Sequence, residues 1–200
     1  MAASTGALRE ARCLGAALAF SLALTATAGR AEEAPIPADL QVELVLKIYS
    51  FDRNLAAGDR GELVVGVLVQ KRYRASFDAA QEILDALRAA AGQGASGRRL
   101  RAQPIGAEAP EELPAALDRT PVDILYVTPL RAFGVEPIST AVRARTVRTV
   151  TAVADLVERG LAVGLRLRED RPEILINLPA AVAEGADFSS QLLSLALVLR

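Results

Sequence analysis

The sequence predicts an α/β protein: a three-layer sandwich with a mostly parallel sheet, a C-terminal antiparallel hairpin and terminal helices. Two observations lead to this fold class. Continuous apolar strands alternate with segments whose apolar residues recur at helical spacing, which is typical of parallel strands joined by helical crossovers. Near the C-terminus, two strands are instead separated by a short charged turn, which indicates an antiparallel pair.

The first half of the predicted domain begins with a helix. Asp39 can cap this helix, which runs to about Phe51. The continuous apolar strand that follows at 63–69 suits the centre of a sheet that is covered on both faces. The next expected elements are a helix from Ser76 or Phe77 to Arg88, a strand near 99–105, a short helix after the polar turn 108–114, and a strand at 122–127.

The second half is predicted to end with the hairpin and two helices. Ahead of the hairpin we expect a helix at 137–143, a strand at 146–150, a helix at 151–158 and a terminator at Gly160. Asp170 and Pro172 place the hairpin turn at 168–173. Asn177 and Pro179 suit the first turn of a helix. The chain is then expected to finish with a second cap at 187–190 and an apolar helix at 191–199.

The N-terminus has the features of an export signal. Arg9 and Arg12 precede an apolar run at 14–24 that is too short to span a membrane as a helix, and 26–28 offers the small residues that a signal peptidase needs. The alternative is an uncleaved N-terminal anchor. We predict a signal peptide at 1–28, a disordered leader at 29–38 and a single domain at 39–200, exported to the periplasm and not membrane-spanning after cleavage.

Composition excludes several kinds of chemistry for the exported chain. The whole chain has a formal net charge of -1, and loss of Arg9, Glu10 and Arg12 with the signal peptide makes it -2. Because this charge is close to neutral, we do not expect nucleic acid as a partner. The only cysteine, Cys13, lies in the signal peptide, and the chain has no histidine or tryptophan. The exported chain therefore has no disulfide, no thiolate nucleophile and no imidazole ligand or base.

Catalytic and cofactor motifs are weak. The spacing G-x-G-x-x-G occurs at 92–97, but it follows a helix rather than a strand, so we interpret it as a flexible connector. The carboxylate pairs 111–112 and 169–170 lie in predicted turns, where water keeps them ionised. Asp123 lies in an apolar strand and needs a basic residue or a backbone N–H as its partner. We therefore expect no enzyme, with no catalytic residue, metal or cofactor.

The loops at the carboxyl ends of the predicted strands are the usual place for a ligand in an open α/β sheet. These loops are 70–74, 128–133 and the segment at Thr151. The first loop could hold an anionic ligand or an acidic partner, and its alternative interpretation is a solvated loop. It carries a basic cluster with one aromatic residue: Lys71, Arg72, Tyr73 and Arg74.

Several segments follow one another along the chain in an order that is recognisable. The set comprises a helix and two strands at 46–55, 63–69 and 122–127, then 147–151 with Asp155, the hairpin from Gly160, 176–178 with Ala180 and Ala181, and 189–193 with Leu195 and Ala196. From 40 to 200 this order resembles the YfiR family (YfiR/HmsC-like), small exported bacterial proteins. The structural motif that carries the likeness contains Asn177, Ser189, Ser190, Leu192 and Leu193.

Local physics already gives these motif residues a role, because Asn177 and the serines can cap helices. The expected last helix is different, since its leucines leave almost no polar face. It is therefore either buried between neighbours or docked on a partner, with Leu193 and Leu197 as candidate contacts.

The resemblance implies a non-enzymatic periplasmic regulator. The best-known relatives bind the periplasmic sensor domain of a membrane-bound diguanylate cyclase and lower cyclic-di-GMP signalling, so the expected partner is a membrane-bound signalling protein. Some relatives carry cysteine pairs thought to sense redox state, and the exported chain here has none. The alternative function is a periplasmic small-ligand-binding or transport-accessory protein, and the sequence leaves a homodimer open.

Overall fold

The structure is a computed structural model that describes residues 36–57, 61–93 and 98–200. The expected signal peptide, most of the expected leader and residues 94–97 of the glycine pattern lie outside the described residues. The described residues belong to one compact unit, Glu33–Arg200.

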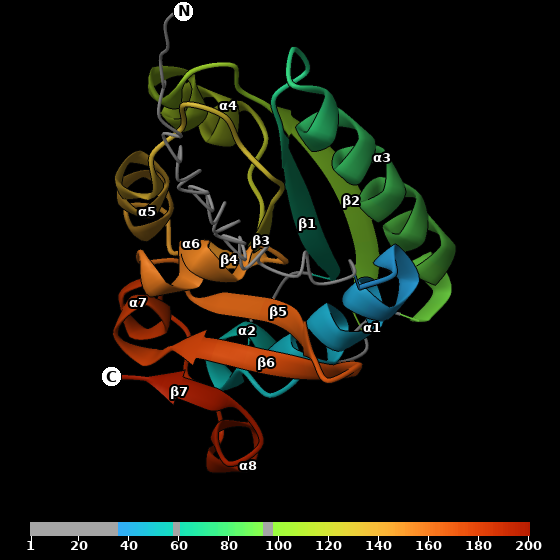
Figure 1. Cartoon of the computed structure of the whole chain (residues 1–200), viewed down its shortest axis with the longest axis vertical. Helices are drawn as coiled ribbons and strands as arrows, with labels where there is room; N and C mark the ends of the chain where they lie inside the picture. Colours follow the sequence, from blue (N-terminus) through green and yellow to red (C-terminus); the bar gives the residue numbers. More distant parts are fainter. Residues whose placement is uncertain (1–35, 58–60, 94–97) are drawn as a thin grey trace, which may run out of the picture. The chain divides into compact units, whose positions relative to one another are not determined.

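A seven-stranded sheet forms the centre of the unit, in the order β2-β1-β3-β4-β5-β6-β7 (Figure 1). Neighbouring strands are parallel except for β5 and β6, which are antiparallel. The strands are β1 (Glu62–Val69), β2 (Arg99–Gly106), β3 (Ile124–Val127), β4 (Arg148–Thr151), β5 (Val163–Arg168), β6 (Arg171–Asn177) and β7 (Leu197–Leu199). The predicted mostly parallel sheet with a C-terminal antiparallel hairpin is confirmed.

Helices cover both faces of this sheet. The helices are α1 (Ala38–Tyr49), α2 (Arg53–Ala56), α3 (Arg74–Ala89), α4 (Leu113–Arg119), α5 (Val135–Arg143), α6 (Ala154–Glu158), α7 (Leu178–Ala183) and α8 (Ser190–Leu193), with short 3₁₀ turns η1 (Ala90–Gln93) and η3 (Pro110–Glu112). One apolar core lies under α1 and α3, and a second lies under α4 and α5 (Figure 1). The predicted three layers are therefore present.

The continuous apolar strands lie at the centre, as predicted. β1 pairs with β2 on one side and with β3 on the other, and the side chains of Val67 and Ile124 are fully buried. β2 lies on one side of β1, and the chain then crosses back to place β3 on the other side. The direction in which strands are added to the sheet therefore reverses between β1 and β3. In open α/β sheets the crevice at such a reversal is the usual ligand site.

The start of α1 differs from the prediction. Pro37 occupies the N-cap position, and Asp39 lies in the first helical turn without capping it. Proline fixes the backbone angle that the chain needs on entering a helix, while the carboxylate of Asp39 favours the positive end of the helix dipole.

The hairpin turn is tighter than predicted. Only Glu169 and Asp170 form it, both with positive φ, which is the two-residue turn that matches the twist of paired strands. Pro172 lies within β6, opposite Leu167. Its missing N–H is tolerated because β7 pairs only with the far end of β6, at Leu175–Asn177.

The predicted last helix at 191–199 is wrong. α8 ends at Leu193, and β7 then pairs in parallel with β6. The outer edge of β6 presents backbone groups that need partners, and β7 satisfies them with Val198 opposite Ile176. The one turn of α8 packs on the core through buried Leu192 and half-buried Leu193.

Candidate functional site

The loops at the carboxyl ends of β1 and β3 lie side by side, as the sequence predicted, but they bond to one another. The amide of Gln70 donates to the carbonyl of Arg131 (3.1 Å) and accepts from the backbone N–H of Arg131 (2.7 Å). The hydroxyls of Ser76 and Thr128 are 2.7 Å apart, and both side chains are fully buried. The polar groups at this crevice thus hold the loops together.

The basic cluster in the first of these loops is exposed and partly compensated. The backbone N–H groups of Lys71 and Arg72 donate to the carboxylate of Glu108, at 2.8 and 3.4 Å. Arg74 pairs with Asp78 at 3.1 Å along α3. Tyr73 lies at the N-cap of α3. The cluster is therefore a charged loop with acidic neighbours, and its role as a ligand contact stays a prediction.

A buried ion pair lies where the end of α1 meets β4. The carboxylate of Asp52 has no exposed surface and accepts from Arg148 Nε at 3.0 Å. Asp52 also accepts from the backbone N–H groups of Asn54 (3.0 Å) and Asp187 (2.9 Å), and through Asn54 it caps α2. Asp52 therefore caps the start of α2 and joins the segment after α1 to β4 and to the segment at Asp187.

A second buried carboxylate, Glu184, lies beside this pair. It accepts from the backbone N–H of Thr149 (2.6 Å) and from the Thr149 hydroxyl (2.8 Å). Burial raises the pKa of Glu184 to about 8, against the hydrogen bonds from Thr149 and the positive charges of Arg143 and Arg148. The hydroxyl of Tyr49 donates to the carbonyl of Thr149 at 2.8 Å, and burial raises its pKa as well.

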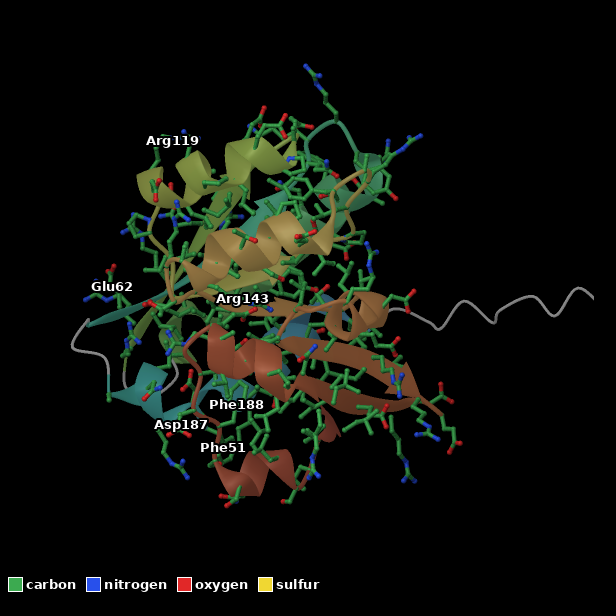
Figure 2. All side chains as sticks on the ribbon, turned by 90° about the vertical axis from the view of Figure 1, so that its left-hand side faces the viewer. Phe51, Glu62, Arg119, Arg143, Asp187 and Phe188 are labelled. Atoms are coloured by element: carbon green, nitrogen blue, oxygen red, sulfur yellow. The ribbon has the colours of Figure 1, made fainter. Side chains whose placement is uncertain are left out.

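These contacts form what we call the polar junction: Tyr49, Asp52, Arg148, Thr149 and Glu184. It fastens the segment between α7 and α8 to the rest of the unit. Phe51, Asp187 and Phe188 lie together in Figure 2, and Ser189 N–H donates to the carbonyl of Phe51 at 3.1 Å. Sequence reasoning missed Glu184 and Arg148, because their partners are remote in the chain. The one available signal was an acidic residue directly after the apolar helix α7.

Two residues of the family-like motif, Asn177 and Ser189, act as helix caps. Asn177 Oδ1 accepts from the N–H of Ala180 (3.1 Å) at the start of α7, and its Nδ2 donates to the carbonyl of Val157 (2.9 Å). Ser189 Oγ accepts from the N–H of Leu192 at the start of α8. Ser190 is the first residue of α8. The capping interpretation is therefore confirmed for Asn177 and Ser189, whereas Ser190 does not cap a helix.

Three apolar side chains that follow β6 in the chain are exposed. We define the C-terminal surface as Val182, Leu195, Leu197 and the outer edge of β7, with side chains exposed by 63%, 72% and 43% respectively. The expected contact Leu193 is half-buried against the core, whereas Leu197 is exposed. Sequence reasoning did not select Val182 or Leu195. In the described part of the chain no strand pairs with the outer side of β7.

Asp123 has the partners that the sequence required. Its Oδ2 accepts from the backbone N–H of Val64 at 2.9 Å and from Arg98 at 3.2 Å, with both charged side chains almost fully buried. Arg98 also donates to the carbonyls of Leu55 and Glu62. This pair fastens the start of β3 to β1 and β2, which is a structural role.

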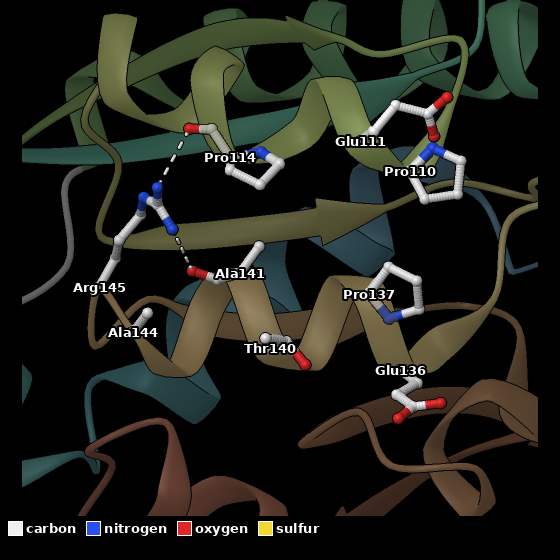
Figure 3. A pocket seen from close by; sticks show the side chains of 9 residues that line it. All are labelled: Pro110, Glu111, Pro114, Glu136, Pro137, Thr140, Ala141, Ala144 and Arg145. Atoms are coloured by element: carbon white, nitrogen blue, oxygen red, sulfur yellow. Dashed lines mark hydrogen bonds between the residues drawn. The ribbon is translucent and has the colours of Figure 1, made fainter.

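A groove of about 550 Å³ lies between η3–α4 and α5 (Figure 3). Its walls are mainly small and apolar: Pro110, Pro114, Pro137, Thr140, Ala141 and Ala144. Arg145 closes one end, and Glu111 and Glu136 lie at the other (Figure 3). Sequence reasoning did not predict this groove, since it depends on how two helices of different segments meet.

Within the described ranges no three acidic, cysteine or histidine side chains are grouped so that they could hold a metal ion. Across the same residues, no helix combines the length and the apolar character needed to cross a membrane.

These observations define an α/β protein whose candidate sites are surfaces and a groove. The chain belongs to the YfiR/HmsC-like family, whose family model matches residues 39–197. Membership supports a periplasmic regulatory role in general. A comparison with the curated proteins gave no match.

Two solved structures share the fold. One is an ABC domain from Streptococcus pneumonia in complex with L-Trp, with a TM-score of 0.58, 16% identity, and coverage of 82% of this chain and 62% of the other. The second is a conserved domain protein from Vibrio cholerae O1 biovar El Tor, with a TM-score of 0.56, 16% identity, and coverage of 82% and 60%. The chain thus spans about three fifths of the length of these proteins.

Proposed function

We propose that the mature chain is a non-enzymatic periplasmic regulator that binds the periplasmic sensor domain of a membrane-bound diguanylate cyclase and lowers cyclic-di-GMP signalling. Family membership supports the regulatory part of this proposal. The observation that carries the binding part is the C-terminal surface. There, exposed Leu195 and Leu197 adjoin a strand edge, and an edge strand can pair with a strand of another protein.

Regulation requires that the protein bind one signalling state of its partner more tightly than the other. The C-terminal surface suits such selective binding because it is held in place by contacts inside the protein. The polar junction and the caps of α7 and α8 hold the segments that carry this surface. A preformed surface loses less conformational entropy on binding than a mobile one.

The test is a pull-down with the tagged mature protein from the solubilised envelope of its own host, followed by mass spectrometry. The Leu195→Glu/Leu197→Glu variant is compared with wild type, and Phe77→Glu is the matched control, since Phe77 is an exposed apolar residue on α3. We expect wild type and Phe77→Glu to recover a membrane protein with a periplasmic sensor domain and a cyclase domain, and the double variant to fail to recover it. Equal recovery by wild type and the double variant would exclude the C-terminal surface as the contact with this partner.

The second candidate function is that of a periplasmic small-ligand-binding or transport-accessory protein. The specific observation in its favour is the groove between η3–α4 and α5, whose volume lies in the range of small-molecule sites. A ligand bound only by the folded state raises the melting temperature by mass action, so a thermal-shift screen separates this function from pure protein binding.

A further inference from the structure

The groove between η3–α4 and α5 has a distribution of charge and apolar surface that selects one class of ligand. We propose that it binds a small molecule with an apolar body and a single cationic group. This site goes beyond the proposed regulatory function, and it lies away from the loops at the carboxyl ends of the strands that the sequence favoured for a ligand.

The body of the groove is apolar on both walls. Pro137, Thr140, Ala141 and Ala144 follow one another at helical spacing along one face of α5, and Pro110 and Pro114 stand opposite them (Figure 3). Because these side chains are short, the two helices leave about 550 Å³ between them. A flat or chain-like apolar group of a small molecule fits this space.

The positive charge in the groove is already used. Arg145 Nε donates to Asp118 Oδ1 at 2.8 Å, and its other nitrogens donate to the carbonyls of Ala141 (2.8 Å) and Pro114 (3.3 Å). Figure 3 shows the last two bonds crossing the closed end of the groove. The guanidinium therefore joins the two walls, and it leaves an anionic ligand little to bind.

The carboxylates at the open end have no ion-pair partner among the described residues. Glu111 and Glu136 stand on opposite walls there, both exposed, and neither carboxylate forms an ion pair or side-chain hydrogen bond within the described residues. A cationic group at this end, with its apolar body along the prolines and alanines, would neutralise these charges. The same charges repel an anion of equal size.

The test is a titration of the ¹⁵N-labelled mature protein, followed by NMR, with three probes that share a phenyl ring: phenethylamine, 2-phenylethanol and 3-phenylpropionate. Saturable shifts are expected in η3, α4 and α5, with the amine binding most tightly and the carboxylate most weakly. Because exposed ion pairs are weak, each glutamate is expected to contribute roughly two- to fivefold in affinity.

Two variants and one control make the site falsifiable. Thr140→Trp places a ring into the groove from an exposed position and is expected to abolish binding. Glu111→Gln/Glu136→Gln is expected to bring the affinities of the amine and the alcohol together. The control is Glu82→Gln, an exposed change on α3 on the other face of the sheet, which should leave the affinities of the amine and the alcohol unchanged. Equal affinity for amine and carboxylate, shifts elsewhere, or no saturable shift up to the solubility limit would overturn the proposal.

Discussion

The two edges of the sheet are built in opposite ways. β2 pairs with β1 over eight residues, exposes Arg99 and Arg101, and contains Pro104. β7 pairs with β6 over only three residues and carries no charge before Arg200. Charges and proline on an edge strand discourage association with other strands. Charge and proline therefore protect the β2 edge, whereas β7 has neither, as the proposed contact surface requires.

The same comparison shows where stability comes from. The eight-residue ladder of β2 is supported by the Arg98–Asp123 pair and by contacts with α3, whereas the three-residue ladder of β7 depends on the polar junction and on the caps of α7 and α8. Changes in the junction should therefore weaken the β7 side first, and they should leave the β2 side intact until the whole unit unfolds.

The largest expected effect is the pH dependence caused by Glu184. Its pKa is about 8 in the folded state and 4.5 in an unperturbed carboxyl, so the folded state binds more protons between these values. The free energy of unfolding should therefore fall as the pH rises from 4.5 to 8, by up to about 5 kcal/mol. Urea unfolding across this range measures it, and Glu184→Gln should flatten the curve. An unchanged slope in the variant would show that Glu184 is not its source.

Breaking the buried ion pair comes next. Arg148→Met leaves Asp52 buried without its charged partner and should cost about 3–5 kcal/mol of stability. The matched control is Arg53→Met, which removes an exposed pair with Asp187 and should cost under about 1 kcal/mol. Hydrogen exchange should show faster opening of α8 and β7 than of β2 in Arg148→Met, and uniform opening would contradict the comparison.

A smaller effect is expected from Gly164 in β5. A Cβ placed there would lie 2.4 Å from Cγ2 of Val157, so α6 can rest against β5 only because this residue is glycine. Gly164→Ala should cost about 1–3 kcal/mol through overpacking. Gly61→Ala, where nothing lies within 4 Å of the new Cβ, is the control in thermal unfolding. Equal melting temperatures for the two variants would rule out this steric account.

The smallest change in stability should accompany a large change in association. Arg99→Val/Arg101→Val removes the charges from the β2 edge, and both side chains are exposed. The free energy of unfolding should change by no more than about 0.5 kcal/mol, while sedimentation should reveal self-association. A variant that stays as monodisperse as wild type would show that these arginines do not protect the edge.

The sequence predicted much of this architecture, for identifiable reasons. Buried strands such as β1 show as continuous apolar runs, and the caps Asn177 and Ser189 are recognisable from their immediate neighbours. The last helix was predicted wrongly because an apolar run does not reveal that the edge of β6 needs a partner strand. The pairing of Arg148 with Asp52 was invisible because 96 positions separate the two residues.

The candidate sites were less predictable than the fold. The sequence singled out Leu193 and Leu197 in the leucine-rich C-terminus, but exposure depends on which residues β7 and α8 turn outward, and Leu195 proved more exposed than Leu197. The groove arises from short side chains on two helices that are separate in the chain, so neither segment alone predicts it.

The most direct test of the central claim compares wild type and Leu195→Glu/Leu197→Glu in the envelope pull-down, with Phe77→Glu beside them. We expect wild type and Phe77→Glu to recover the same membrane-bound cyclase, and the double variant to lose it while keeping the wild-type melting temperature. Recovery of that cyclase by a stably folded double variant would contradict the claim that the β7 edge is the contact surface.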